Sequence, residues 1–260
     1  MTTDYLSTLF NLTGKVVALT GAGGFLVGEM SRGLARAGMR VAVLDVSLEA
    51  AERVSAEIGQ AGGEAMALAV DVRQKESYAS ALAAILKRWG QLDAVVLGAG
   101  ANAPTPFLEI PVDEWNNILA VQLTGTMLGC QVFGAHMIAA GGGSILTISS
   151  ASSGPPLSKA FTYSVAKAGV KNLTQNLARE WATSNVRVNA LRPGFFPTEW
   201  SMKHFITPER EAAILGHTAM KRYGRPPELV GAVLWLLSDA ASFVTGAEIP
   251  VDGGFTAMTI

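Results

Sequence analysis

The sequence predicts an α/β protein in which a doubly wound parallel sheet carries helices on both faces. Short apolar runs without polar alternation, as in strands buried on both faces, alternate along the chain with stretches of helical periodicity. A glycine-rich turn joins the first such run to the first helical stretch. Strand–helix units repeated at this length favour parallel pairing, because each helix returns the chain to the starting edge of the sheet. The chain contains no linker or shift in composition, so residues 1–260 are expected to form one domain.

Composition excludes several classes of protein. Of the residues, 49% are hydrophobic and 16% are charged, which indicates a globular core and argues against disorder. The formal net charge of -1 gives no reason to expect nucleic acid or an anionic membrane as a partner. We expect no secretory leader, and no uninterrupted apolar run reaches the length of a membrane span. The single cysteine, Cys130, rules out an intrachain disulfide and suits a reducing compartment, so a cytoplasmic location is expected. The three histidines lack metal-ligand spacing, and no metal site is expected.

The first half of the chain predicts four strands separated by three helices. The strand before the glycine turn is an apolar run, and the second strand ends in an acidic residue, Asp45. Gly62 and Gly63 end the helix that follows, and the third strand runs up to Asp71. The expected strands are residues 15–20, 40–45, 64–70 and 92–97, and the expected helices are residues 25–37, 48–61 and 75–89.

The second half continues the alternation after a proline-bearing connection over residues 103–111. Asp113 is expected to be the N-cap of a long helix, because its side chain can accept hydrogen bonds from the first free N–H groups. A loop with Gly154, Pro155 and Pro156 leads to the helix that contains Tyr163. The remaining expected elements are helix 113–139, strand 143–149, strand 186–191, helix 226–238 and strand 247–251.

Residues 195–219 break this rhythm with a segment that is too aromatic for an idle surface loop. Two interpretations stay open: a small helical lid over a substrate pocket, or an excursion that packs against the body of the protein. The segment contains Phe195, Phe196, Trp200, His204 and Phe205 among polar residues.

Glycine and acidic residues follow the predicted strands, where open α/β sheets bind their ligands. Gly21, Gly23 and Gly24 let the backbone approach a pyrophosphate, which the free N–H groups of the next helix would bind. Asp45 can accept hydrogen bonds from ribose hydroxyls and would repel a 2′-phosphate, so NAD is expected in preference to NADP. Asp71 could hold the amine of adenine. Alternatively, either acid could be the N-cap of the following helix.

Tyr163, Lys167 and Ser150 form a candidate catalytic group. Tyr163 and Lys167 are four residues apart and therefore share one face of a helix. A free tyrosine holds its proton up to a pH of about 10, and a nearby ammonium lowers that pKa. The tyrosine could then exchange a proton with a substrate hydroxyl or carbonyl while Ser150 hydrogen-bonds the same oxygen. Tyrosine–lysine pairs also occur on solvated helix faces, so this assignment depends on the rest of the chain.

Further short motifs stand in a fixed order around these residues, and with them the chain resembles the short-chain dehydrogenase/reductase family over essentially its whole length. The family fold is a single-domain, Rossmann-type sheet of seven parallel strands, which the resemblance therefore implies here. The matching positions are Thr20-Gly21 with the glycine turn, Asp45, Asp71-Val72, Gly98-Ala99-Gly100, Ile148-Ser149-Ser150, Tyr163 with Lys167, Val188-Asn189-Ala190, Pro193-Gly194 with Thr198, and Val251-Asp252-Gly253-Gly254.

The resemblance implies a role for each matching position. Ser150 would bind the reacting oxygen, and Tyr163 would be the acid and base. Lys167 would bond the nicotinamide ribose and lower the pKa of the tyrosine. Further implied cofactor contacts are Phe25, Leu26, Val72, Gly98, Ala99, Gly100 and Phe196, and the nicotinamide carboxamide would be held by Pro193, Gly194 and Thr198.

The chain departs from the usual family pattern at two places. Phe25 and Val27 occupy positions at which the family usually has glycine, as in a subgroup similar to D-mannonate oxidoreductases and gluconate 5-dehydrogenases. Gln122 replaces the asparagine that holds a water in the family's proton relay. Glutamine carries the same amide on a longer arm, so the relay is expected to persist or to be rearranged.

Substrate contacts are predicted less sharply. Lys159 stands where the mannonate-type enzymes carry a lysine and could meet a substrate carboxylate, although a solvated loop lysine explains it equally well. Arg192 could serve the same purpose or pair on the cofactor side. The other candidate substrate contacts are Asn102, Ser152, Trp200, Lys203 and His204.

The expected function is NAD-dependent transfer of a hydride between nicotinamide and a secondary alcohol or ketone of a sugar acid, sugar or polyol. A 3-oxoacyl or steroid-type reductase is the alternative within this enzyme class, since the aromatic lid would suit it but Asp45 argues against NADPH. A non-catalytic NAD-sensing protein of the same fold is a second alternative, which the change at Gln122 favours. The resemblance also implies a homotetramer, a dimer of dimers that packs through helices 113–139 and 161–184 and strand 247–251.

Overall fold

Seven parallel strands form the single sheet of the part of the chain that the structure describes. The structure is a computed structural model, and it describes residues 5–259 apart from the side chains of Trp200, His204 and Phe205. The strand order is β3-β2-β1-β4-β5-β6-β7, so the chain reverses direction across the sheet between β1 and β4. The predicted doubly wound fold of seven strands is thereby confirmed. The strands are β1 (Val16–Thr20), β2 (Arg40–Asp45), β3 (Glu64–Ala69), β4 (Ala94–Leu97), β5 (Gly143–Ile148), β6 (Val186–Pro193) and β7 (Glu248–Val251).

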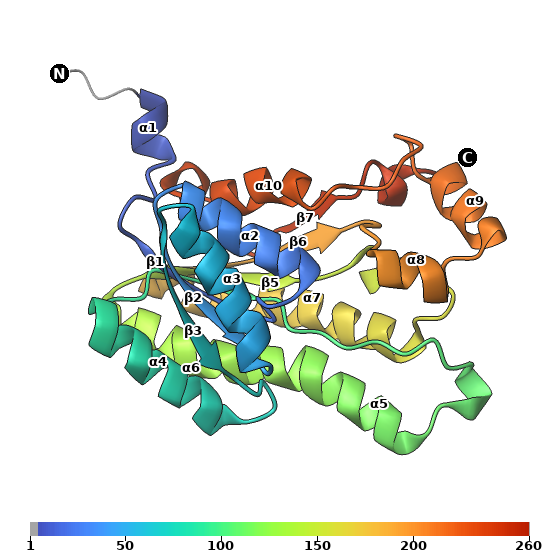
Figure 1. Ribbon diagram of the computed structural model, residues 1–260, viewed down its shortest axis with the longest axis horizontal. Coiled ribbons are helices and arrows are strands. Elements are labelled where there is room, and N and C mark those ends of the chain that lie inside the picture. Colours follow the sequence, from blue (N-terminus) through green and yellow to red (C-terminus); the bar gives the residue numbers. More distant parts are fainter. Residues whose placement is uncertain (1–4, 260) are drawn as a thin grey trace.

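Helices cover both faces of this sheet (Figure 1). Successive strand residues point to opposite faces, so Val17 and Leu19 join one core whereas Val16 and Ala18 join the other. The first core also contains residues of α2 (Phe25–Arg36), α3 (Leu48–Gln60) and α10 (Pro227–Leu237). The second contains residues of α4 (Lys75–Trp89), α6 (Gly125–Ala140) and α7 (Phe161–Trp181). Because both faces are covered, the strands read as continuous apolar runs.

The helix before α6 begins differently from the prediction. Asp113 is not the N-cap of α5 (Val112–Leu119), because Pro111 holds that position and Asp113 lies inside the first turn. A proline suits a helix start, since its fixed φ is close to helical and it has no N–H to leave unpaired. A π-helical turn, Ala120–Thr124, then separates α5 from α6.

The helical stretch Val112–Ala140 is long and apolar enough, by length and composition alone, to cross a membrane. In the fold, its residues Phe133 and Met137 are fully buried against the sheet and α4. Core packing therefore accounts for the apolar residues on the inner face of α6.

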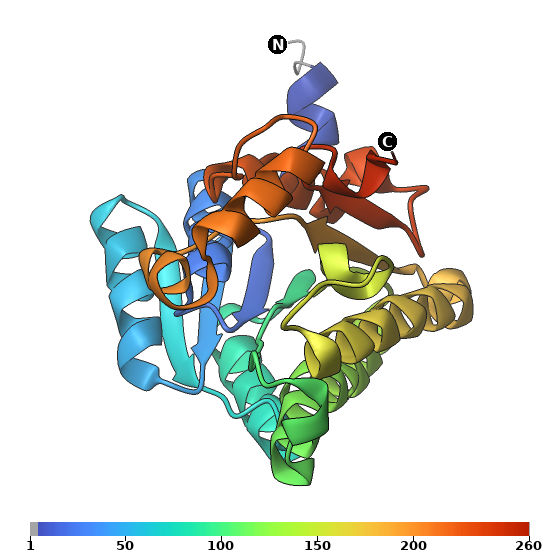
Figure 2. The same cartoon turned by 90° about the vertical axis from the view of Figure 1, so that its right-hand side faces the viewer.

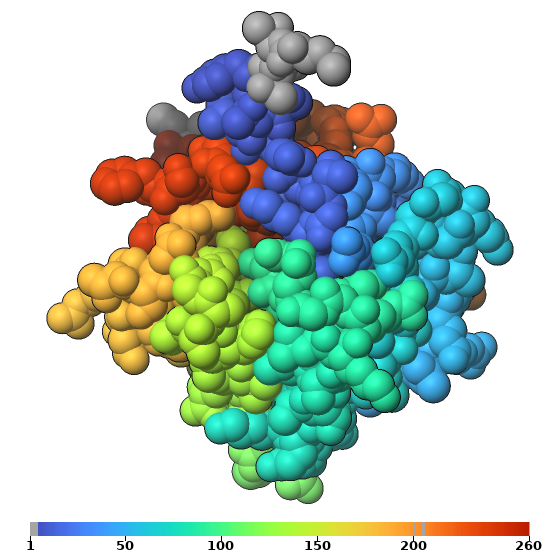
Figure 3. Space-filling view, turned by 90° about the vertical axis from the view of Figure 1, so that its left-hand side faces the viewer, coloured from blue at the N-terminus to red at the C-terminus, as the bar shows by residue number. Residues whose placement is uncertain are grey.

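Residues 195–219 form two short helices beside the carboxyl ends of the strands. Thr198 caps α8 (Glu199–Phe205), and Thr207 caps α9 (Pro208–His217), in each case by accepting a hydrogen bond from a backbone N–H of the first turn. Both helices project at the same side of the molecule as α5 (Figures 1 and 2). The opposite side carries α1 (Tyr5–Leu9), which stands out from the surface (Figure 3).

Candidate active site

The strand order reverses between the paired strands β1 and β4, and the predicted nucleotide site lies at the carboxyl ends of these two strands. Thr20, the last residue of β1, accepts hydrogen bonds at Oγ1 from the backbone N–H groups of Gly98 (3.1 Å) and Ala99 (3.3 Å). These bonds hold the segment after β4 beside the glycine turn that follows β1. Open α/β sheets bind their ligands at such a switch point.

The glycine turn fits tightly against its neighbours. Gly21 has a φ of +70°, and a Cβ there would lie 2.7 Å from the Cα of Ala99. A Cβ on Gly23 would lie 2.6 Å from the Cβ of Ala50. Any larger residue at either position would push the turn away from these contacts, so both positions require glycine.

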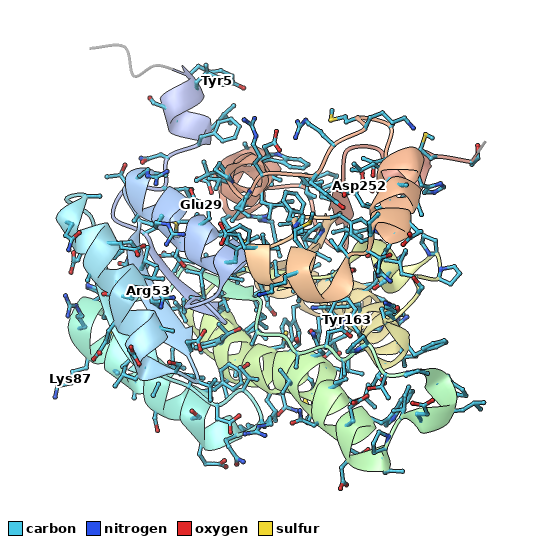
Figure 4. The ribbon with its side chains drawn as sticks, turned by 45° about the vertical axis from the view of Figure 1, so that its right-hand side comes forward. Tyr5, Glu29, Arg53, Lys87, Tyr163 and Asp252 are labelled. Atoms are coloured by element: carbon cyan, nitrogen blue, oxygen red, sulfur yellow. The ribbon has the colours of Figure 1, made fainter. Side chains whose placement is uncertain are left out.

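Asp45 lies at the end of β2 and faces this turn. Its Oδ2 accepts a hydrogen bond from the N–H of Gly23 (3.0 Å), and its Oδ1 accepts one from the N–H of Ser47 (3.0 Å). Ser47, not Asp45, is the N-cap of α3, so the alternative interpretation of Asp45 as an N-cap was wrong. Arg53 of α3, labelled in Figure 4, donates from Nη2 to the carbonyl oxygen of Gly23 (3.0 Å).

Asp71 is engaged by a neighbouring cation. The guanidinium of Arg73 binds its carboxylate, with Nη2 2.8 Å from Oδ2. These hydrogen bonds hold the pKa of Asp71 below its ordinary value. Gln74 is the N-cap of α4, so the interpretation of Asp71 as an N-cap was also wrong. A cavity of about 170 Å³ is shared by the predicted cofactor residues Gly21, Asp45, Asp71, Val72, Ala99 and Gly100.

Phe25 and Leu26 are the first two residues of α2. Helices leave their first N–H groups without intrahelical partners, so the backbone here offers donors next to the glycine turn. Gly24 is the N-cap and offers no side chain to occupy them. Phe25 is 48% exposed, so its side chain is not buried over the start of this helix.

Ser150 and Tyr163 meet in a second cavity, of about 440 Å³. The nearby Ser150 hydroxyl favours a lower pKa for the tyrosine. Burial has the larger effect, so the pKa of Tyr163 is raised overall and the phenol keeps its proton at neutral pH. Ser152 donates to Ser150 Oγ from both its backbone N–H (3.2 Å) and its hydroxyl (3.1 Å). In Figure 4, Tyr163 lies in the half of the molecule that carries α8.

Lys167 lies beside the tyrosine ring but bonds elsewhere. Its Nζ is 5.5 Å from the centroid of the Tyr163 ring and donates to the carbonyl oxygen of Ile148 at 2.6 Å. Burial lowers the pKa of this amine to about 7. The expected lowering of the tyrosine pKa by the lysine is not seen: burial raises the pKa of the phenol, and burial also lowers the pKa of the amine.

Gln122 lies on the π-helical turn and is almost fully buried. Its Nε2 donates to the carbonyl oxygen of Ala101 at 2.7 Å, while its Oε1 has no protein partner among the described residues. A Cβ on Gly100 would lie 2.9 Å from Nε2, so the glycine makes room for the longer amide. An unpaired buried acceptor of this kind is available to a water or a ligand hydroxyl.

The turn after β6 lies against the C-terminal segment. A Cβ on Gly194 would lie 2.6 Å from the Cα of Asp252, and Gly194 donates from its N–H to Val251 (3.0 Å). Thr198 uses its hydroxyl to cap α8 by accepting from the N–H of Ser201 (3.0 Å). The ring of Phe196 lies so close to Gly224 that a Cβ at Gly224 would overlap it.

The larger cavity contains three of the predicted substrate contacts, Asn102, Ser152 and Lys159. The side chains of Trp200 and His204 lie outside the described residues. Arg192 does not line the cavity, and instead donates from Nη1 to Glu248 (3.2 Å), so it is no candidate for a substrate carboxylate. Lys203 is exposed and does not line it either. The remaining lining residues are Ser150, Ala151, Leu157, Ala160, Tyr163, Gly194, Phe195, Phe196, Pro197, Ser201, Ile206 and Arg210.

Arg210 is a cavity residue that the sequence did not reveal. It lies on α9 and donates to Ser158, from Nη1 to Oγ (2.8 Å) and from Nη2 to the carbonyl oxygen (3.0 Å). These bonds hold the guanidinium next to Lys159, which has a positive φ of 58°. In the sequence, Arg210 looks like any arginine on a polar helix, so only the fold brings it to the pocket.

Comparison with known proteins identifies relatives over almost the whole chain. The family model described as "Enoyl-(Acyl carrier protein) reductase" matches residues 28–256. An uncharacterized oxidoreductase, UxuB, of Bacillus subtilis is 37% identical, with 95% of this chain and 96% of the relative covered. The galactitol 2-dehydrogenase (L-tagatose-forming) of Cereibacter sphaeroides is 37% identical (97% and 99% covered), and the 5-keto-D-gluconate 5-reductase of Escherichia coli is 34% identical (96% and 98% covered).

Solved structures give the same picture. A protein described as a D-mannonate oxidoreductase from Haemophilus influenza, with bound NAD, has a TM-score of 0.90 at 33% identity, with 96% and 97% of the two chains covered. One described as an NAD(P) dependent gluconate 5-dehydrogenase from Beutenbergia cavernae, with bound NADP, has a TM-score of 0.90 at 34% identity (96% and 99% covered). A 7 alpha-hydroxysteroid dehydrogenase complexed with NADH and a 7-oxo bile acid also has a TM-score of 0.90, at 33% identity (95% and 96% covered).

Proposed function

The chain belongs to the short-chain dehydrogenase/reductase family, and we propose that it is an NAD-dependent dehydrogenase whose substrate is a sugar acid. More broadly, it is an oxidoreductase that uses a nicotinamide cofactor on alcohol groups of sugar- or polyol-like substrates. The preference for NAD and the carboxylate of the substrate are the proposed parts.

One observation carries the proposed chemistry: Ser150 and Tyr163 both line the wall of the larger cavity. Tyr163 would take the proton of the substrate hydroxyl in oxidation and return it in reduction, while Ser150 would orient the same oxygen. NAD⁺ would supply the hydride acceptor. Lys167, when protonated, would favour the phenolate of Tyr163, and its pKa of about 7 lets it hold or release a proton near neutral pH.

The residues at the switch point fit a dinucleotide. Gly21 and Gly23 leave no space for a Cβ, and the start of α2 offers free N–H groups for a pyrophosphate. Asp45 would bond the adenosine ribose and repel a 2′-phosphate, which supports NAD over NADP. The Arg73 guanidinium is hydrogen-bonded to the carboxylate of Asp71, so it would have to shift before Asp71 could bind the adenine amine.

The charge of the substrate cavity supports a carboxylate in the substrate. Lys159 and Arg210 both line it, and no acidic residue is among its described lining residues. Two cations without a carboxylate to balance them favour an anionic ligand, and a sugar acid has both the anion and the secondary alcohol that this site needs.

The test is turnover by the purified protein. We expect NADH, followed by absorbance, to form from NAD⁺ with at least one hexonic acid of the gluconate or mannonate type, and more slowly with the matching polyols. Turnover of a 3-oxoacyl thioester or a hydroxysteroid in place of the sugar acids would instead favour the reductase alternative, for which Leu157 and Ile206 supply apolar cavity wall. Tight NAD binding without turnover of any alcohol would favour a sensor.

A homotetramer in the cytoplasm is proposed as the working form. Large apolar side chains of the segment before α5, of α5 and of α7 are exposed on the single chain, and the rings of Phe107 and Phe161 lie 5.4 Å apart among them. Such a patch favours burial between subunits. Its members are Phe107, Leu108, Val112, Phe161 and Val165.

A further inference from the structure

A buried carboxylate lies behind the loop that carries Ser150. It belongs to Glu248, the first residue of β7, whose side chain is only 9% exposed. Both of its oxygens are bound. Taking a carboxylate out of water is costly, so a buried one is expected to have fixed partners.

Two serines occupy one oxygen of this carboxylate. Ser149 donates from its hydroxyl to Oε1 of Glu248 at 2.6 Å, and Ser153 donates to the same oxygen at 2.7 Å. Both serines are themselves buried. Ser149 precedes Ser150 in the chain and Ser153 follows it. One carboxylate oxygen therefore holds the chain on both sides of the proposed catalytic serine.

The backbone conformation at Ser150 determines which way its side chain points. Ser150 is extended, with φ of -161° and ψ of 157°, and consecutive side chains of an extended segment point to opposite sides. Because Ser149 points back to Glu248, Ser150 points away from it, toward Tyr163 and the cavity. A hydrogen bond from the N–H of Ser153 to the carbonyl oxygen of Ser150 (2.9 Å) closes the turn.

Two cations occupy the other oxygen. Arg192 Nη1 and Lys171 Nζ each lie 3.2 Å from Oε2 of Glu248. Burial on its own would raise the pKa of Glu248, but the serine hydroxyls and these two charges together hold it below its ordinary value. The group therefore stays ionised at neutral pH, which strengthens its hydrogen bonds to both serines.

We propose that Glu248 is a positioning residue: it aims the Ser150 hydroxyl at the reacting oxygen by holding Ser149 and Ser153. Arg192 extends the same support to the cofactor side, because it directly precedes the turn at Pro193 and Gly194 that is proposed to hold nicotinamide. The inference rests on the proposed function, since it requires Ser150 to take part in the reaction.

A double-mutant cycle between Glu248 and Ser150 tests this inference. With the best substrate of the wild type, Glu248→Val is expected to lower kcat by at least about 10-fold, with KM for NAD⁺ changed less than 2-fold. Glu248→Gln keeps an oxygen for the serines and is expected to lose less than Glu248→Val. In a Ser150→Ala background, Glu248→Val is expected to cause no further loss, because the residue acts only through the serine.

Each result has one meaning. If Glu248→Val lowers kcat by the same factor with and without Ser150, the carboxylate has only a structural role and the inference is wrong. If Ser150→Ala alone leaves kcat unchanged, it is the proposed function that fails. Should Glu248→Val not fold, Ser149→Ala/Ser153→Ala replaces it in the cycle with the same expectations. Glu64→Val is the matched control, since Glu64 is the first residue of the opposite edge strand, β3, and its loss should leave kcat unchanged.

Discussion

The ammonium of Lys167 lies 5.5 Å from the centre of the Tyr163 ring, yet its hydrogen bond goes to the carbonyl oxygen of Ile148. The lysine thus stands close enough to act on the tyrosine through its charge, but burial sets the pKa of both groups in the free chain. The tyrosine keeps its proton more tightly than in water, and the lysine keeps its own less tightly. Perturbed pKa values of this kind are typical of functional sites.

Removing the phenol hydroxyl should abolish most of the activity. Tyr163→Phe keeps the ring and its packing, but it has no proton to exchange, so kcat is expected to fall by about 100- to 10,000-fold. Steady-state kinetics measures this, with NAD⁺ binding followed by protein fluorescence as the control. A variant that keeps more than a tenth of the wild-type kcat would show that another group acts as the acid and base.

The buried lysine should make stability depend on pH. Its pKa is about 7 in the folded chain against the ordinary 10.5, so between these values the unfolded chain holds a proton that the folded chain has released. The free energy of unfolding should therefore rise with pH in this window, by up to ~1.4 kcal/mol per pH unit from this group. Below about pH 7, the full cost of burying the amine is present.

Lys167→Met cannot titrate and isolates this effect. We expect it to be more stable than the wild type at pH 7, with the difference shrinking toward pH 9, as measured by urea unfolding at several pH values. Lys87→Met is the control, since Lys87 is exposed near the far end of α4 (Figure 4). Parallel pH curves for the wild type and Lys167→Met would contradict the prediction.

Asp45 should decide the choice between the two nicotinamide dinucleotides. Asp45→Asn can still accept one of its two backbone hydrogen bonds but no longer repels a phosphate. The ratio of kcat/KM for NAD⁺ to that for NADP⁺ is expected to fall by about 10-fold or more, equivalent to ~1.4 kcal/mol. An unchanged ratio would mean that the carboxylate does not face the adenosine ribose.

The two cavity cations should select the carboxylate of the substrate. Lys159→Met and Arg210→Met are each expected to raise KM for a sugar acid by about 10-fold, because a charge-assisted hydrogen bond contributes ~1.5–3 kcal/mol. KM for the matching neutral polyol should change little, and this comparison is the control. Equal effects on acid and polyol would place the two side chains outside the carboxylate site.

Substitutions at Gly100 and Gln122 should have coupled effects on the free energy of unfolding. Gly100→Ala places a Cβ 2.9 Å from the Gln122 amide nitrogen, so the amide must give up its hydrogen bond to Ala101, at a cost of about 1 kcal/mol of stability. Shortening the side chain in Gly100→Ala/Gln122→Asn should recover space and part of that loss. Chemical unfolding of the two single variants and the double variant measures the coupling, and strictly additive effects would exclude it.

Local sequence signals predicted most of the scaffold. The helix Lys75–Trp89 was predicted with its observed bounds, and the predicted helix at residues 48–61 ends one residue later than α3. Both have clear periodicity and a glycine next to the last turn. The start of α5 was predicted wrongly because Asp113, a residue type that often caps helices, lies close to Pro111, and the sequence alone does not decide where the helix begins.

The support of the site was less predictable, because it depends on contacts between distant parts of the chain. Glu248 bonds Ser149 across 99 residues, and Arg210 bonds Ser158 across 52. Neither residue lies in a motif or at a distinctive spacing. By contrast, Asp45 follows an apolar run next to a glycine turn, so its place at a strand end could be inferred from neighbouring residues alone.

The threonine caps of α8 and α9 have a consequence for how enzymes of this shape diversify. Each helix pairs one N–H group of its first turn with a hydroxyl from its own segment, so its start is capped without a bond to the sheet. We expect such a segment to be exchangeable between homologues that keep its contacts to Ser158 and Phe255, while Tyr163 and Lys167 stay on α7. Replacing residues 195–219 with those of a homologue of different specificity is then expected to change the substrate specificity and to leave the catalytic residues in place.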